Sequence, residues 1–112
     1  MRKSLLALVL VVVAAGAAFV VPALAASSKT VTVGDSFFKA KSLTVKKGTK
    51  VTWKWTGALP HNVTVQKGPK KFASKTQTSG SFSQTLTKPG TYQIVCTIHK
   101  SLGMVMTLKV TK

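Results

Sequence analysis

A series of short runs rich in valine, threonine and aromatic residues constrains the fold of this chain more than any other feature. The runs follow residue 25, turn residues separate them, and no apolar repeat of helical period accompanies them. Apolar and polar side chains alternate in 51–55 and in 107–110, as they do in half-buried strands. About seven strands are therefore expected, at 29–33, 42–45, 50–55, 62–66, 80–86, 91–95 and 105–110.

The spacing of these runs also indicates how the strands are arranged. The segments 47–48 (Lys-Gly) and 88–90 (Lys-Pro-Gly) are turn signals, and no candidate crossover helix lies between the runs. Short strands joined in this way predict an all-β fold, an antiparallel β-sandwich. The polar and basic segment 66–79 has Phe72 as its only large apolar residue, so we expect a long loop or an irregular edge there.

The N-terminal segment has the three parts of a secretory signal peptide. Basic residues near the start are followed by an uncharged apolar run, 5–21, and by Pro-Ala-Leu-Ala at 22–25. We expect a helical signal peptide at 1–25 that is cleaved after Ala25, leaving one exported domain at 26–112 in the periplasm or elsewhere outside the cytoplasm. The alternative is an uncleaved membrane anchor, because the run approaches the ~20 residues that a spanning helix needs.

Cys96 is the only cysteine of the chain, so no internal disulfide is possible. A small exported domain without a disulfide often gains its stability elsewhere, and a bound metal is one source. A free thiol outside the cytoplasm is also exposed to oxidation and to mixed disulfides. Both considerations favour a specific chemical role for this cysteine.

The charge of the chain is extreme. Its 17 lysine and arginine residues oppose one acidic residue, Asp35, which gives a formal net charge of +16. Such a surface attracts anions of many kinds, including nucleic acid, anionic surfaces and acidic proteins. Lysines most often form only a solvated surface, but a basic rim that includes Lys100 would speed the encounter with an acidic partner.

Three side chains with metal-binding atoms lie within nine residues, between the two last expected strands. They are the thiol of Cys96, the imidazole of His99 and the thioether of Met104, and His61 lies at another strand edge. A thiolate, two imidazoles and a weak thioether suit copper. Structural zinc prefers four strong ligands, and oxygen-preferring metals lack carboxylates here because Asp35 is the only one.

Each of these residues also has an interpretation without a metal. A lone cysteine such as Cys96 is often a small buried core residue, and a methionine at the start of a strand, such as Met104, is usually core. His61 alone could be a surface histidine after a turn. Met106 shares a strand face with Met104 but lies one strand step deeper, so it is the poorer ligand.

The sequence resembles the cupredoxin family of type 1 (blue) copper proteins, especially its small plastocyanin-, pseudoazurin- and amicyanin-like members. The segments that carry this resemblance are 38–45, 47–53, 60–62 (Pro-His-Asn), 80–82, 89–92 (Pro-Gly-Thr-Tyr), the Cys-x₂-His-x₄-Met loop and 104–110. The resemblance implies a Greek-key cupredoxin-like sandwich with one copper ion, which alternates between Cu(I) and Cu(II).

The same resemblance implies roles for individual residues. His61, Cys96 and His99 would be the equatorial copper ligands and Met104 the axial ligand. The side chain of Asn62 would tie the His61 loop to the Cys96 loop near Thr97, which fixes the orientation of the ligands. Many family members have proline where this chain has Ile98, and we hypothesise that the regained Ile98 N–H points at the Cys96 sulfur and raises the reduction potential.

The resemblance also implies a function: a monomeric, non-enzymatic carrier of single electrons between extracytoplasmic redox proteins, which are acidic by charge complementarity. Electrons would leave through an apolar patch of Leu59, Pro60, Leu102 and Gly103. One alternative is a copper store or chaperone. Another is a basic anion-binding module without metal, but the aromatic residues alternate as core instead of interleaving with lysine, so no specific nucleic-acid binding is expected.

Overall fold

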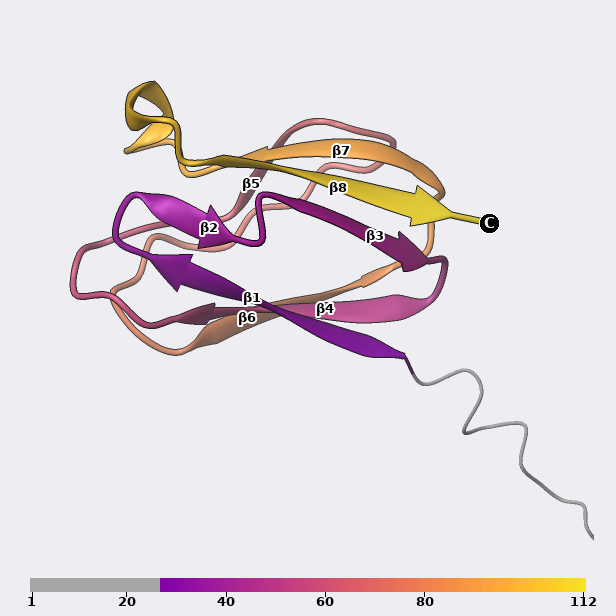
Figure 1. The fold of residues 1–112 in the computed structure, drawn as a ribbon, viewed down its shortest axis with the longest axis horizontal. Coiled ribbons are helices and arrows are strands. Elements are labelled where there is room, and N and C mark those ends of the chain that lie inside the picture. Colours follow the sequence, from indigo (N-terminus) through magenta and orange to yellow (C-terminus); the bar gives the residue numbers. More distant parts are fainter. Residues whose placement is uncertain (1–26) are drawn as a thin grey trace, which may run out of the picture.

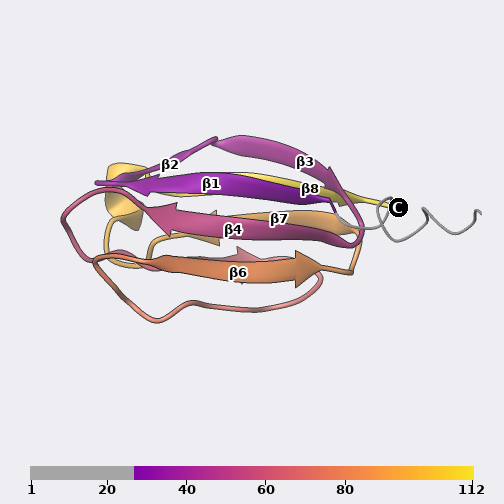
Figure 2. The same ribbon diagram turned by 90° about the horizontal axis from the view of Figure 1, so that it is seen from below.

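The computed structural model describes residues 27–112, which form two sheets packed face to face (Figures 1 and 2). The expected signal peptide and its cleavage site lie outside the described residues. The strands are β1 (Ser28–Gly34), β2 (Phe37–Lys39), β3 (Ser42–Lys46), β4 (Thr49–Trp55), β5 (Thr64–Lys67), β6 (Ser81–Leu86), β7 (Gly90–Val95) and β8 (Val105–Thr111). Among residues 27–112 no helix has the length and apolarity that crossing a membrane requires.

The expected β-sandwich is confirmed, and its sheets turn out to be mixed. One sheet has the order β2-β1-β4-β6 and the other β3-β8-β7-β5. Most neighbours are antiparallel, but β1 pairs with β4 and β3 with β8 in parallel. The chain changes sheets between β2 and β3, so strands that are distant in sequence become neighbours. Alternation of side chains shows which face of a strand is buried, not which strand lies beside it.

All seven expected strands are present, and one further strand was missed. β2 has only three residues and forms a hairpin with β1 in which Gly34 pairs with Phe37. A run this short shows no alternation that a sequence pattern could detect. β5 begins at Thr64 instead of residue 62, because the preceding residues make an isolated bridge with the segment around Gln77.

The core lies between the sheets, as the alternation in 51–55 predicts. Trp53 and Trp55 are both buried on one face of β4, whereas Lys54 between them is exposed. The Trp53 ring lies 6.0 Å from the rings of Phe72 and Phe82, measured between centroids. Phe72 thus covers the edge of the core from the long segment after β5, which is mostly irregular, as expected.

The two ends of the sandwich carry different residues. The "histidine end" consists of the turn 35–36 and the loops 56–63 and 96–104. The "lysine end" consists of the turns 46–49 and 86–90 and the C-terminal residue. In Figure 1 the loop between β7 and β8 marks the histidine end on the left, and the C-terminus marks the lysine end on the right.

Candidate metal centre

The β7–β8 loop holds three of the four predicted ligands close together. Cys96 directly follows β7, and its N–H donates to the carbonyl of Met104 at 3.1 Å, just before β8 begins. The Met104 N–H in turn donates to the carbonyl of His99 at 3.2 Å. Gly103 ends the short 3₁₀-helix η2 (Lys100–Leu102) with φ of 87°, a left-handed conformation that glycine adopts without strain. The loop is therefore closed by its own backbone.

His61 reaches the same place from the loop between β4 and β5. Its backbone exchanges two hydrogen bonds of 3.0 Å with Gln77, and its carbonyl accepts a bond from the Trp55 indole at 3.3 Å. The side chain of His61 is completely buried. Contacts on both its N–H and its carbonyl thus fix the backbone from which the ring projects.

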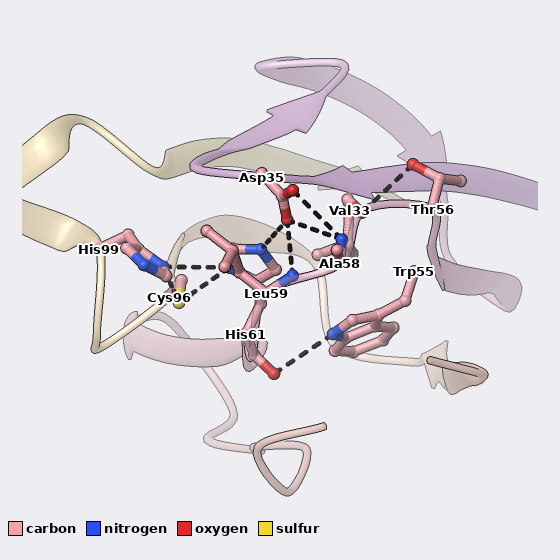
Figure 3. A network of polar contacts seen from close by, with 9 residues as sticks. All are labelled: Val33, Asp35, Trp55, Thr56, Ala58, Leu59, His61, Cys96 and His99. Atoms are coloured by element: carbon pink, nitrogen blue, oxygen red, sulfur yellow. Dashed lines mark hydrogen bonds and ion pairs between the residues drawn. The ribbon is translucent and has the colours of Figure 1, made fainter. Parts of the chain in front are cut away.

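The donor atoms of His61, Cys96 and His99 form a small triangle (Figure 3). The two Nδ1 atoms are 3.0 Å apart, and the Cys96 Sγ lies 3.9 Å from Nδ1 of His61 and 3.6 Å from Nδ1 of His99. Nitrogen and thiolate ligands sit about 2.0–2.3 Å from a transition-metal ion. A triangle with these edges therefore has room for one ion that contacts all three atoms.

The Asn62 side chain links this cluster to its surroundings. Its Nδ2 donates to the Thr97 hydroxyl at 2.9 Å and to the Thr76 hydroxyl at 3.1 Å. Its Oδ1 accepts from the Thr97 N–H at 3.1 Å and from the Thr64 hydroxyl at 2.9 Å. The buried amide thus uses all its hydrogen-bonding capacity, and it joins the His61 loop to the Cys96 loop at Thr97.

Asp35 contacts a predicted ligand, a contact that the sequence analysis did not expect. Its carboxylate, in the turn between β1 and β2, accepts hydrogen bonds from Nε2 of His61 at 2.9 Å and from the N–H groups of Ala58 and Leu59 at 3.1 and 3.0 Å. The bond from His61, followed by those from Leu59 and Ala58, lowers the pKa of Asp35 to about 2. The sequence offered one sign that Asp35 is special: it is the only acidic residue of a chain with 17 lysine and arginine residues.

The comparisons with known proteins identify the family. Residues 25–111 match the family model of the copper binding proteins of the plastocyanin/azurin family. The chain belongs to this cupredoxin family. Amicyanin-alpha of Methylorubrum extorquens strain AM1 is 34% identical to it over 90 residues, which cover 77% of this chain and 76% of that protein.

Solved structures agree with this assignment. A Cu(I) form of an amicyanin variant superposes with a TM-score of 0.65 at 27% identity, covering 75% of this chain and 82% of that one. Auracyanin of Roseiflexus castenholzii superposes with a TM-score of 0.63 at 24% identity, covering 77% and 98% of the two chains, which shows a shared fold.

The cofactor of this cupredoxin is copper, as the sequence predicts, and the donor set of the triangle fits that metal. One thiol sulfur and two imidazole nitrogens are the three strong ligands of a blue-copper site. The three atoms lie within 4.8 Å of one another, and both Cys96 and His61 are buried. A structural zinc site would require a fourth strong ligand.

The remaining predicted site residues of this cupredoxin are placed as follows. Met104 is completely buried beside the loop, and its role as axial ligand stays a prediction. Met106 is occupied elsewhere, because its sulfur accepts the Trp53 indole N–H at 3.4 Å. The Ile98 side chain is 50% exposed. Within residues 27–112 no hydrogen bond joins the Ile98 amide to the Cys96 sulfur, so the proposed effect of Ile98 on the potential also stays a prediction.

The two histidine rings differ in their access to solvent. His61 is completely buried, whereas His99 is only partly buried. Leu59 and Leu102, on the loops that carry the two histidines, are 46% and 68% exposed. The His99 side of the centre is therefore the side that is open to solvent.

Proposed function

We propose that this cupredoxin carries single electrons, with its copper held by His61, Cys96 and His99 and with Met104 as the axial ligand. The observation that carries the proposal is the triangle of donor atoms, with edges of 3.0–3.9 Å, built from two loops that are distant in sequence. Copper bound there would supply the one-electron Cu(II)/Cu(I) couple. The protein holds the ligands, excludes water on the His61 side and leaves the His99 side open.

The way the ligands are held supports a carrier. Backbone bonds close the Cys96–Met104 loop, and Asn62 ties that loop to the His61 loop through Thr97. Ligands fixed in this way move little when the charge of the ion changes, which keeps electron transfer fast. Leu59 and Leu102 are exposed on the loops that carry the two histidines, and they would form a small apolar contact surface through which the electron leaves.

Export and partners are also part of this proposal. Residues 1–25 would be a signal peptide removed after Ala25, so that residues 26–112 work as a monomer in the periplasm or elsewhere outside the cytoplasm. The strong positive charge favours acidic redox proteins as electron donors and acceptors, because complementary charge speeds their encounter. We propose no enzymatic activity for the domain.

Copper binding by the purified 26–112 domain tests the proposal. Addition of Cu(II) should give the intense blue absorption of a thiolate-to-copper transition, and Cys96→Ser should abolish it because the hydroxyl that replaces the thiol is a poor copper ligand. Voltammetry of the blue form should show a reversible one-electron couple. Tight Cu(I) binding without a reversible couple would instead identify a copper store or chaperone. Absence of any copper binding would contradict both.

A further inference from the structure

The Asp35 carboxylate, although partly exposed, is held by hydrogen bonds from a second loop (Figure 3). The N–H groups of Ala58 and Leu59 point at it from the loop after β4. Gly57 gives the carboxylate the room it needs, because a Cβ built on Gly57 would overlap the Asp35 side chain. Three consecutive residues of one loop thus fix the place of Oδ1, which lies 2.9 Å from Nε2 of His61.

The pairing partner of Asp35 is also unexpected on charge alone. Lysines are abundant, yet in the part of the chain that the structure describes no lysine lies within ion-pair distance of this carboxylate. The only acid of the chain faces a histidine instead. Because its side chain is 39% exposed, burial does not account for the absence of a lysine partner, so the contact with His61 is a property of the local geometry.

The contact determines which nitrogen of His61 carries the proton. An ionised carboxylate only accepts hydrogen bonds, so Nε2 must be the donor and must hold the ring hydrogen. In the neutral ring Nδ1 then has a free lone pair, and this is the atom that faces Cys96 and His99. The ring is thus held in the one tautomer that can bind a metal inside the triangle.

We propose that Asp35 is a positioning residue of the copper centre: it holds His61 in its metal-binding tautomer before copper arrives, and its negative charge favours Cu(II) over Cu(I). A carboxylate bonded to the far nitrogen of a histidine ligand makes that ligand a stronger donor. A stronger donor and a nearby negative charge both stabilise the ion of higher charge, so Asp35 lowers the reduction potential. This proposal rests on the proposed function.

Three variants separate the effects of position and charge. Asp35→Asn keeps an accepting oxygen and removes the charge, whereas Asp35→Ala removes both. Gly57→Ala keeps the carboxylate but pushes it off His61, so it is the matched control for a change in net charge. Asp35 and Gly57 lie on two different segments, so one substitution can disturb the fold while another does not. Circular dichroism identifies any variant that misfolds.

Nitrogen chemical shifts of the His61 ring, measured by NMR in the metal-free protein at neutral pH, test the positioning role. The unchanged protein and Asp35→Asn should show the tautomer protonated at Nε2, and Asp35→Ala should show a mixture of tautomers. A single unchanged tautomer in Asp35→Ala would overturn this part of the proposal. The measurement needs no copper, so it tests the positioning role of Asp35 even if the protein proves not to be an electron carrier.

The reduction potential of the copper-loaded protein tests the effect of the charge. In Asp35→Asn and in Gly57→Ala the affinity for Cu(II) should fall about 10–100-fold relative to Cu(I), and each tenfold change raises the potential of a one-electron couple by about 59 mV. A relative affinity within about twofold of the unchanged protein in both variants would overturn the proposal. Absence of a reversible couple in the unchanged protein would refute the carrier function itself.

Discussion

Side-chain hydrogen bonds between distant segments add to the backbone bonds at the histidine end of the sandwich, whereas backbone bonds predominate at the lysine end. At the histidine end, side chains join segments far apart in sequence, as Asn62 does with Thr97 and Asp35 with His61. At the lysine end, backbone bonds of 2.7 Å from Lys47 to the carbonyl of Thr111 and from Gly48 to that of Leu86 fix the turn 46–49 against β8 and β6.

The difference shows where a substitution acts. A turn closed by backbone bonds accepts many side chains, so the lysine end can carry its positive charges without effect on the fold. The histidine end depends on a few side chains that are each bonded to several partners. Stability and copper chemistry should therefore both respond to changes at the histidine end, and stability alone to changes at the lysine end.

Replacement of Asn62 by alanine should have the largest effect on stability. The change leaves the partly buried Thr97 N–H without its partner and removes three further bonds of the buried Asn62 amide. We expect the free energy of unfolding to fall by about 2–3 kcal/mol, measured by urea denaturation of the metal-free domain. The reduction potential should change as well, because the two ligand loops lose their link.

Thr52→Ala is the matched control for Asn62→Ala. The Thr52 hydroxyl shares a 2.8 Å bond with the Ser83 hydroxyl on the outer surface, where water replaces the lost partner. A loss below about 0.5 kcal/mol is expected there. Equal losses for the two variants would contradict the special role of the histidine end.

Replacement of Tyr92 by phenylalanine should have a smaller effect that is confined to stability. The Tyr92 hydroxyl donates to the carbonyl of Lys88 at 2.7 Å, a side-chain bond that supports the turn 86–90. Its loss should lower the free energy of unfolding by about 1 kcal/mol. The reduction potential should not change, and a shift as large as that of Asn62→Ala would show that the two ends are coupled.

Alkaline pH should produce the smallest effect, through the same tyrosine. Burial raises the pKa of Tyr92 above its ordinary value of 10.0, because the charged phenolate is disfavoured in the core. The folded protein then holds this proton more tightly than the unfolded chain does, so the contribution to stability is present below pH 10 and is lost as the pH rises above it.

Unfolding measured between pH 9 and 11 checks this expectation. Stability should fall more steeply with pH in the unchanged protein than in Tyr92→Phe, since the variant has no phenol to ionise. Parallel curves for the two proteins would mean that other groups, such as the many lysines, account for the whole alkaline loss.

Much of the fold could be predicted from the sequence because each long strand alternates its side chains with period two. The run from Val51 to Trp55 shows this pattern completely, and its burial follows it. β2 could not be predicted because three residues are too few for a pattern. The parallel pairing of β1 with β4 could not be predicted either, because pairing depends on where the chain changes sheets.

The residues of the candidate site likewise divide into those that the sequence predicts and those that it does not. Cys96, His99 and Met104 could be predicted as a group because one short loop between two strands carries all three. His61 could be added from its ring nitrogen and its place at a strand edge. Asp35 could not be assigned, because its partner is 26 positions away and turn 35–36 has an ordinary composition. Only the folded topology brings that turn beside the loop of His61.

A crystal structure of the copper-loaded 26–112 domain would test the central claim most directly. We expect one copper ion bonded to Nδ1 of His61, Nδ1 of His99 and Sγ of Cys96, each at about 2.0–2.3 Å, and the Asp35 carboxylate still bonded to Nε2 of His61. Copper bound outside this triangle, or bound through Nε2 of either histidine, would contradict the account.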